Sequence, residues 1–302
     1  MIQEAYKRQV TLLLKVLPEV AKENCFALYG GTAINLFVRD MPRLSVDIDL
    51  IYVPIEDRAT SLASISAALK RISANIAKLI RNSRIVHKEE AAKLQIAADG
   101  IEIKLEVNLV ARGTLGPPEK MILCERAQKE FDAFCAIQVV PFGQLYGGKI
   151  RAALDRQHPR DLFDIRDLLG KEGFSDEVRR GFIYSLVCSD RPMNEIISPN
   201  FQDQRSTLEN YFAGMTAEPF TYEDFENTRE RLVRTINTNM TPDYRRFLLS
   251  LKDLNPDWKI YDWQHFPAVA WKLQNLHKLK ETNPAKYRAQ YQKLGEKLDG
   301  GS

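Results

Sequence analysis

Two aspartates inside an apolar segment constrain this chain more than any other feature. Residues 46–52 read VDIDLIY, which is typical of a buried strand except at Asp47 and Asp49. Side chains two positions apart on a strand project to the same side, so both carboxylates should lie together while Ile48 faces the core. Two close like charges repel, and burying a carboxylate without a cation is costly. The pair therefore predicts a divalent cation, and Mg²⁺ suits carboxylate and phosphate oxygens.

Two adjacent glycines precede this segment. Gly30 and Gly31 follow the short apolar stretch CFALY, and Thr32 can cap a helix that begins with AINLFVRD. A turn without side chains at the start of a helix offers backbone N–H groups to a phosphate. Glycines at a tight turn have a purely structural interpretation too. Because the two aspartates follow so closely, we favour phosphate binding.

The first part of the chain should mix helices and strands. Apolar side chains recur at helical spacing from residue 2 to 17, and Pro18 should end or kink that helix. We expect one long basic amphipathic helix over residues 56–84. Residues 101–110, IEIKLEVNLV, alternate between apolar and polar side chains, which predicts a half-buried strand.

The later part of the chain should be helical. FGQLYGGKIRAALDR and PRDLFDIRDLLG predict consecutive helices, and prolines separate further helical stretches beyond residue 176. A chain of 302 residues with 44% hydrophobic residues can form two domains. We therefore predict an α+β protein with a mixed sheet in residues 1–140 and a helical domain in residues 141–302.

Basic residues gather in two places although the formal net charge is only +3. Residues 62–88 contain six Lys or Arg and no Asp or Glu, and residues 272–302 form a basic tail with seven basic against three acidic residues. Clustered positive charge suits a polyanion such as RNA. The alternative is a pair of solvated helix faces.

Composition also narrows the compartment and class of the chain. The start MIQEAYKRQV carries charges where a signal peptide would be apolar, and no apolar stretch reaches the roughly 20 residues of a membrane span. Four separated cysteines show neither disulfide nor metal-ligand spacing. We expect a cytoplasmic protein without disulfides.

The aromatic residues near the end of the chain predict part of the core. Trp258, Trp263 and Trp271, together with Tyr261 and Phe266, should pack inside the helical domain. Base stacking by one of these rings is the alternative.

Two motif groups show a family resemblance that covers residues 24–170. GGTAINLF followed by RLSVDIDL resembles the nucleotidyltransferase fold of the DNA polymerase β superfamily. GGKIRAALDRQHPRDLFDIRDLL is similar to the later motifs of the AbiEii/AbiGii toxin family, with a lysine early in one helix, an arginine late in it, and then RDLFD. The resemblance implies a polymerase β-like nucleotidyltransferase core followed by a helical domain.

The resemblance also implies roles for individual residues. Triphosphate would lie at Gly30, Gly31 and Thr32, and Mg²⁺ at Asp47 and Asp49. Lys149 and Arg156 would bind the nucleotide phosphates, and Asp161 would act as a base or orient the attacking hydroxyl. Metal, lysine and backbone amides together would neutralise the charge of a transferring phosphoryl group.

Several of these residues have alternatives. Glu106 is the candidate for a third metal carboxylate, with Glu102 on the same face of the strand, and either one can be a solvated strand residue. Lys149 and Arg156 can form ordinary salt bridges to Asp161 or Asp155. Asp164 lies one turn after Asp161 and competes with it for the acidic role.

The function implied by the resemblance is that of a toxin. Such an enzyme transfers NMP from an NTP to an RNA acceptor, typically the 3′ end of tRNA, in a toxin–antitoxin or abortive-infection system with a separately encoded antitoxin. One alternative is a small-molecule, antibiotic-type nucleotidyltransferase with the same metal site. Another is a non-catalytic nucleotide or RNA binder, which would not need two metal carboxylates.

Overall fold

The computed structural model describes residues 3–299, which form two compact units. The first unit contains the chain up to Pro141 together with Tyr211–Pro219, and the second contains Phe142–Asn210 and the chain from Phe220 onward. The division expected at residue 140 had placed the segment Tyr211–Pro219 in the helical domain, whereas the structure places it in the first unit.

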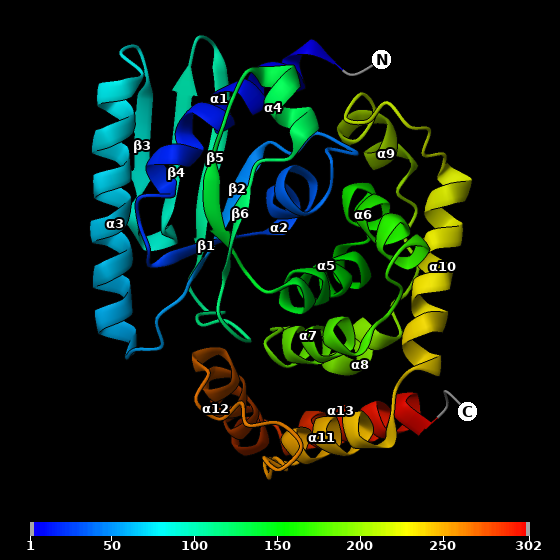
Figure 1. The fold of residues 1–302 in the computed structure, drawn as a ribbon. Coiled ribbons are helices and arrows are strands. Elements are labelled where there is room, and N and C mark those ends of the chain that lie inside the picture. The colour runs from blue at the N-terminus through cyan, green and yellow to red at the C-terminus, as the bar shows by residue number, and fades with distance from the viewer. Residues whose placement is uncertain (1–2, 300–302) are drawn as a thin grey trace. The chain divides into compact units, whose positions relative to one another are not determined.

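The first unit consists of a mixed seven-stranded sheet with helices packed on it (Figure 1). Its strands are β1 (Phe26–Tyr29), β2 (Asp47–Tyr52), β3 (Arg84–Lys88), β4 (Lys93–Ala98), β5 (Ile101–Asn108), β6 (Glu119–Ile122) and β7 (Ala136–Val139). Its α-helices are α1 (Glu4–Val20), α2 (Gly30–Ala33), α3 (Arg58–Leu79) and α4 (Glu125–Phe131), and a π-helix (Ile34–Val38) directly follows α2. The sheet confirms the predicted α+β class with a mixed sheet.

The strand order β3-β4-β5-β2-β1-β7-β6 places the aspartate-bearing strand in the middle of the sheet. Strand β2 is antiparallel to β1 and parallel to β5, so it has a partner on both sides. Buried residues alternate with half-buried ones along β4 and with mostly exposed ones along β5, as the sequence pattern of β5 predicts. A central, doubly paired strand holds its side chains more rigidly than an edge strand would.

Helix α1 runs past the proline that was expected to end or kink it. It continues to Val20 with Pro18 inside its last turn. Leu17 and Val20 are fully or almost fully buried, and Ala21 N still donates to Leu17 O at 2.9 Å. Burial of this last turn outweighs the one hydrogen bond that a proline removes. The predicted end of the helix at Pro18 was therefore wrong, and the alternative, a kink at Pro18, stays a prediction.

The long helix expected over residues 56–84 is shorter in the structure. Helix α3 begins after Asp57, whose side chain accepts a hydrogen bond from Thr60 N at 3.0 Å, and ends at Leu79. Ile80 has an extended backbone, and Arg84–Lys88 then form the edge strand β3 beside β4. Exposed and half-buried side chains alternate along β3, as is typical of an edge strand. The helical spacing of the preceding residues had hidden this alternation in the sequence.

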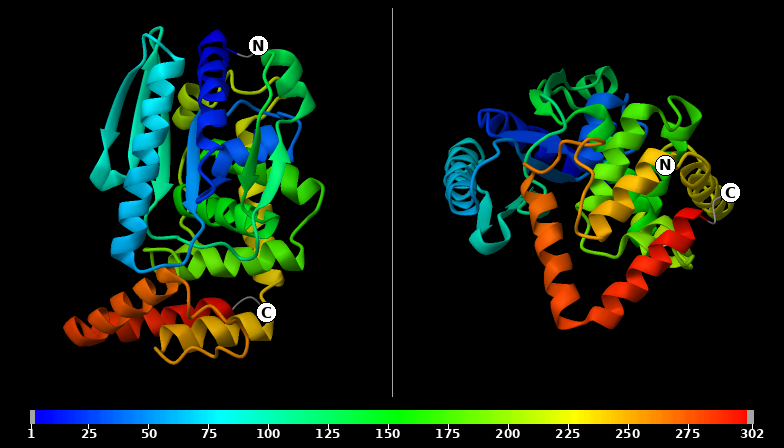
Figure 2. Two further views of the ribbon diagram at one scale, coloured as in Figure 1. Left: turned by 60° about the vertical axis from the view of Figure 1, so that its left-hand side comes forward. Right: turned by 90° about the horizontal axis from the view of Figure 1, so that it is seen from below.

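The second unit is helical, as predicted for most of this part of the chain (Figures 1 and 2). Its helices are α5 (Phe142–Arg156), α6 (Pro159–Gly170), α7 (Asp176–Val187), α8 (Met193–Ile197), α9 (Arg205–Tyr211), α10 (Tyr222–Thr238), α11 (Pro242–Lys252), α12 (Pro267–Thr282) and α13 (Pro284–Asp299). Helices α5 and α7 pack backbone to backbone, because a Cβ atom on Gly143 or Gly147 would collide with α7.

Aromatic rings form part of the core of this unit. The Trp263 and Tyr261 rings stack with 3.9 Å between centroids, and Phe247 packs edge-on against Trp263 at 5.4 Å. The Trp258 ring also packs against the Phe247 ring, with 6.2 Å between their centroids. Trp271 does not join this core, because 46% of its surface is exposed. That part of the predicted cluster was wrong.

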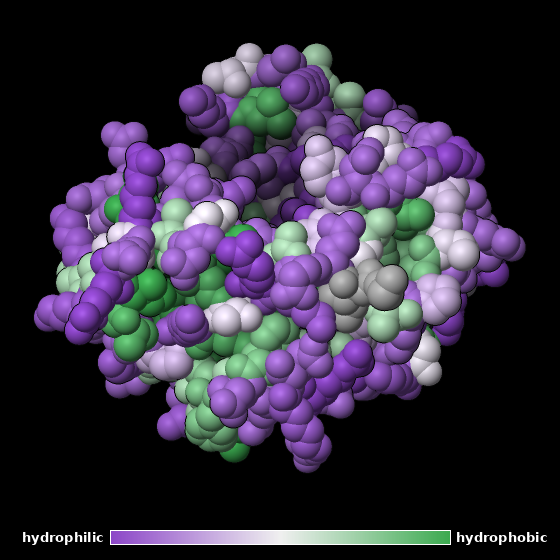
Figure 3. Space-filling view, turned by 90° about the horizontal axis from the view of Figure 1, so that it is seen from above, coloured by the Kyte–Doolittle hydropathy of each residue, from purple (hydrophilic) through white to green (hydrophobic). Residues whose placement is uncertain are grey.

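Within residues 3–299, no helix combines the length and apolar character that crossing a membrane requires. Polar side chains cover most of the face in Figure 3, and apolar side chains form smaller patches between them. The four cysteines are free thiols.

Candidate functional site

The two aspartates project from one side of strand β2. Asp47 and Asp49 are half-buried while Ile48 and Leu50 between and after them are fully buried, which is the alternation predicted from the sequence. Parallel pairing with β5 sets Asp49 beside Glu106 and Asp47 beside Lys104. The central sheet therefore places three carboxylates and one ammonium group on the same side of two neighbouring strands.

Gly30 lies against the side chain of Asp49. It begins α2 with a φ of +74°, and it follows Tyr29, the partner of Asp49 in the β1–β2 pairing. A Cβ atom at Gly30 would collide with the Asp49 carboxylate. Glycine is thus needed here for its backbone conformation and for the space that Asp49 occupies.

Gly31 lies against a buried arginine that the sequence argument did not single out. A Cβ atom there would stand 2.9 Å from Arg43 Nη2 and 3.0 Å from Ser45 Oγ. Arg43 is only 2% exposed, and its Nη1 donates to Leu44 O at 2.9 Å. Its position in RLSVDIDL, as a basic residue four positions before the first residue of β2, was the sequence signal that could have identified it.

Residues Tyr211–Pro219 hold the segment that carries this arginine. Leu44 N donates to Met215 O at 2.7 Å, and Thr216 Oγ1 donates to Pro42 O at 3.0 Å. Arg43 and Thr216 form an isolated antiparallel bridge. A segment distant in sequence thus fixes the approach to strand β2.

Thr32 does not cap the helix as expected. Helix α2 already begins at Gly30, so Thr32 lies inside it and is fully buried. Its hydroxyl donates to Asp47 O at 2.5 Å and lies 3.0 Å from Ser45 Oγ. The Thr32 side chain therefore connects the glycine turn to the first residue of β2. The backbone N–H of Thr32 is the group that suits a phosphate.

The carboxylates around β2 fit a cation that takes further ligands from its substrate. Among residues 3–299, no three or more Asp, Glu, His or Cys side chains form a complete cluster for a metal ion. Glu106 forms an ion pair with Lys93 on strand β4, which leaves Asp47 and Asp49 as the carboxylate pair. Two carboxylates completed by phosphate oxygens and water are a ligand set that Mg²⁺ commonly takes.

The predicted lysine and acidic motifs lie in the second unit as a buried ion cluster. Lys149 Nζ on α5 is 2.9 Å from Asp161 Oδ1 and 3.1 Å from Asp164 Oδ2 on α6. His158 Nδ1 caps α6 by accepting from Arg160 N at 3.1 Å. Lys149 is 7% exposed, so both aspartates share one deeply buried cation.

A second cation completes this cluster from its outer side. Arg156 Nε and Nη2 donate to the two carboxylate oxygens of Asp161, at 2.6 and 3.0 Å. Burial opposes ionisation of Asp161, but the charges of Lys149 and Arg156 outweigh it and hold the pKa of that carboxyl below its usual range. The Arg156 side chain remains 63% exposed.

The predicted site residues therefore fall into two groups, one in each unit. The first group, in the sheet unit, is Gly30, Gly31, Thr32, Asp47, Asp49 and Glu106. The second group, in the helical unit, is Lys149, Arg156, Asp161 and Asp164. The salt bridges that we had considered as the alternative for Lys149 and Arg156 are present, and their contact with nucleotide phosphates stays a prediction.

Comparison with known proteins gives the family. Residues 11–275 match the family described as nucleotidyl transferase AbiEii toxin, type IV toxin–antitoxin system. The chain belongs to the AbiEii family. A search of curated proteins found no match. AbiEii membership confirms the resemblance stated from the GGT, DID and RDLFD motifs, and it makes this chain a nucleotidyltransferase toxin of a type IV toxin–antitoxin family.

A solved structure among those that match has a similar fold. The nucleotidyltransferase toxin MenT4 from Mycobacterium tuberculosis H37Rv is similar with a TM-score of 0.59 and 16% sequence identity, over 91% of this chain and 95% of that one. At this level of identity the likeness concerns the fold. It supports the nucleotidyltransferase architecture predicted from the sequence.

Proposed function

We propose that this AbiEii toxin transfers an NMP from an NTP, with Mg²⁺, to the 3′ end of an RNA, and that the RNA is tRNA. The observation that carries the proposal is the arrangement around β2. Two half-buried carboxylates project from β2 on the same side, beside a glycine turn. This turn begins helix α2, so its backbone N–H groups are the first of that helix. Carboxylates for a metal and amides for a triphosphate are the two things that such a transfer requires.

The chain's own residues would bind and orient the nucleotide. The backbone N–H groups of Gly30, Gly31 and Thr32 would donate to triphosphate oxygens, and the buried Arg43 adds a positive charge beside that turn. Asp47 and Asp49 would hold Mg²⁺. The ion would supply charge neutralisation for the transferring phosphoryl group.

The second group of residues would contribute positive charge to the nucleotide as well. Arg156 has the exposure needed for a phosphate contact, whereas Lys149 already neutralises two buried carboxylates. A carboxyl with a lowered pKa is a weak base, so we assign Asp161 the task of positioning Lys149 and Arg156.

RNA and an antitoxin are the proposed partners. Exposed basic residues on and after α3 would attract RNA phosphates, and a separately encoded antitoxin would neutralise the toxin. Because NTPs and tRNA are cytoplasmic, we propose the cytoplasm as its place of action. A small-molecule acceptor remains the alternative outcome of the acceptor assay described below.

Replacing either aspartate of β2 by asparagine tests the site. Asp47→Asn and Asp49→Asn should each lose label transfer from an α-labelled NTP by at least about a hundredfold, because one metal oxygen ligand is lost. Thermal stability should hold or rise, since one of two like charges is removed. Transfer would be measured at saturating Mg²⁺ and stability by thermal unfolding.

Two glutamates on β5 provide the matched comparison. Glu102→Gln changes an exposed residue on the same face, and it should keep full activity. Glu106→Gln should lower activity only if Glu106 leaves Lys93 to bind the metal. Full activity of Asp47→Asn or Asp49→Asn, or unfolding of either variant, would make the aspartate pair structural.

A further inference from the structure

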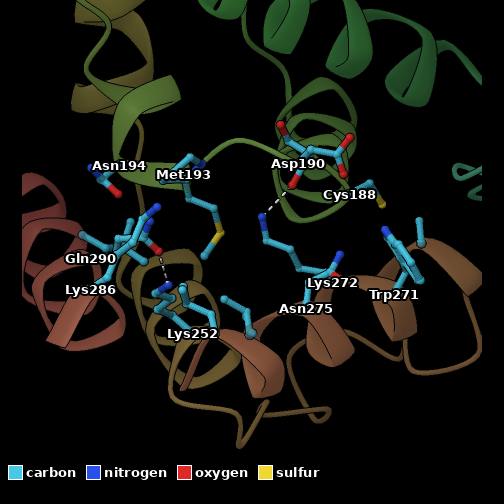
Figure 4. A pocket seen from close by; sticks show the side chains of 16 residues that line it. Cys188, Asp190, Met193, Asn194, Lys252, Trp271, Lys272, Asn275, Lys286 and Gln290 are labelled. Carbon is cyan, nitrogen blue, oxygen red and sulfur yellow. Dashed lines mark hydrogen bonds between the residues drawn. The ribbon is translucent and has the colours of Figure 1, made fainter. Parts of the chain in front are cut away.

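A cavity in the helical unit carries an excess of positive charge. It has a volume of about 230 Å³ and lies among α8, α11, α12, α13 and the loop after α7 (Figure 4). Three lysines reach it, and we call them the lysine cluster: Lys252, Lys272 and Lys286. Asp190 is the one acidic residue of its lining. The balance is two positive charges in excess.

Two of these lysines are buried and lie outside any salt bridge that the described residues form. Lys252 and Lys272 are 4% and 8% exposed, and within residues 3–299 neither forms a salt bridge, although the charge of Asp190 acts to raise the pKa of Lys272. Lys252 Nζ donates to Gln290 Oε1 at 2.8 Å (Figure 4). Lys272 Nζ donates to the backbone oxygens of Ser189 at 2.6 Å and Arg191 at 3.3 Å. Neutral oxygens satisfy hydrogen bonds, but they do not neutralise charge.

Such an arrangement works against folding. Burial lowers the pKa of Lys252 and of Lys272 to about 8, so both ammonium groups are mostly protonated at neutral pH. A buried charge normally has an ionic partner, because desolvation is otherwise uncompensated. An anion that enters the cavity would therefore neutralise the charge of these two lysines.

The rest of the lining favours an organic anion over a bare inorganic one. Met193, Leu276 and Trp271 supply apolar parts of the lining, which we call the apolar wall, and Trp271 is the aromatic residue that stays outside the core. Ammonium groups act as compact point charges toward tetrahedral oxyanions, and two excess charges match a phosphate monoester dianion. The lysine cluster would complement the phosphate of such a molecule, and the apolar wall would complement its organic group.

We propose that this cavity binds a small phosphate monoester, with its phosphate among the lysine cluster and its organic group against the apolar wall. The site is independent of Asp47 and Asp49, and binding there requires neither a metal nor nucleotidyl transfer. A ligand at this position would tie α11, α12 and α13 to the loop after α7.

Calorimetric titration with phenyl phosphate tests the site. The full chain would be titrated in EDTA, with inorganic phosphate and phenol as separate comparators. We expect one phenyl phosphate per chain, with inorganic phosphate about tenfold weaker because it lacks the ring that contacts the apolar wall. Phenol should not bind. Absence of saturable phenyl phosphate binding, or phenol binding equally well, would overturn the proposal.

Four variants locate the binding. Lys272→Met and Lys286→Met should each weaken phenyl phosphate binding by at least about tenfold, since each loses a charged donor. Lys286 is exposed, so its variant serves even if Lys272→Met does not fold. Lys278→Met removes an exposed charge from α12 outside the cavity, and Asp47→Asn alters the nucleotide site; both should bind normally. Unchanged binding in Lys286→Met, or its loss in Asp47→Asn, would place the ligand elsewhere.

Discussion

At the scale of single residues, Gly30 shows how closely the glycine turn and the aspartates depend on each other. Gly30→Ala should abolish nucleotidyl transfer and destabilise the protein, because the new methyl group meets the Asp49 carboxylate and the φ of +74° disfavours alanine. Activity and chemical denaturation would be measured on the same preparation. A fully active Gly30→Ala variant would show that Asp49 needs no fixed position.

Gly100 is the matched control for that substitution. Its φ of +75° is within one degree of that of Gly30, but nothing lies within 4 Å of a Cβ atom there. Gly100→Ala should therefore cost only the backbone strain, about 1 kcal/mol, and leave activity unchanged. The difference between the two variants measures the collision with Asp49 apart from the strain.

The Lys149 cluster makes a second prediction at this scale. Lys149→Met should destabilise the protein by about 3 to 5 kcal/mol, because Asp164 loses its salt bridge to Lys149 and Asp161 keeps only Arg156. Arg156→Met removes a mostly exposed side chain, so it should cost less stability and raise the KM for NTP. Equal stability of the two variants would contradict this ranking.

The lowered pKa of Asp161 gives the cluster a pH dependence. Its folded pKa lies below its unfolded value, so its contribution to stability is complete above about pH 4 and is lost as the pH falls further. Denaturant midpoints measured from pH 7 to pH 3 should fall more steeply in the wild type than in Asp161→Asn. Parallel curves would mean that Asp161 is not stabilised as a charge.

At the scale of elements, the sequence predicted the strands that carry the site better than the helices around them. Strict alternation identified β5, and the DID segment identified β2, because both strands are buried on one face. Local pattern could not locate the end of α3, since β3 becomes a strand only through its pairing with β4. Arg43 was missed because its burial depends on the distant segment Tyr211–Pro219.

The early end of α3 changes the basic surface that was expected to meet RNA. Lys70 and Arg71 form salt bridges with Glu89 and Glu23, so their charges are partly used within the protein. Lys78, Arg81 and Arg84 are exposed, but they lie on a helix, a turn and a strand in place of one helical stripe. These three residues are the best candidates for phosphate contacts in this region.

Reversing the charge of these three residues tests the contact with RNA. A variant with Lys78, Arg81 and Arg84 replaced by glutamate should bind tRNA more weakly and keep its affinity for NTP. Each lost phosphate contact should flatten the double-logarithmic salt dependence by about one unit. Binding across a salt series would be compared with the wild type. Parallel lines would remove this region from the RNA-binding surface.

At the scale of the whole molecule, membership of the AbiEii family identifies the chain as a nucleotidyltransferase toxin. The acceptor that we propose for it is the 3′ end of tRNA. The most direct measurement uses α-labelled NTPs and Mg²⁺ with intact tRNA, with tRNA whose 3′ terminal diol has been oxidised by periodate, and with small hydroxylated compounds. We predict label on intact tRNA, none on oxidised tRNA, and none with Asp47→Asn or Asp49→Asn. Label on a small compound with none on RNA would contradict the proposal.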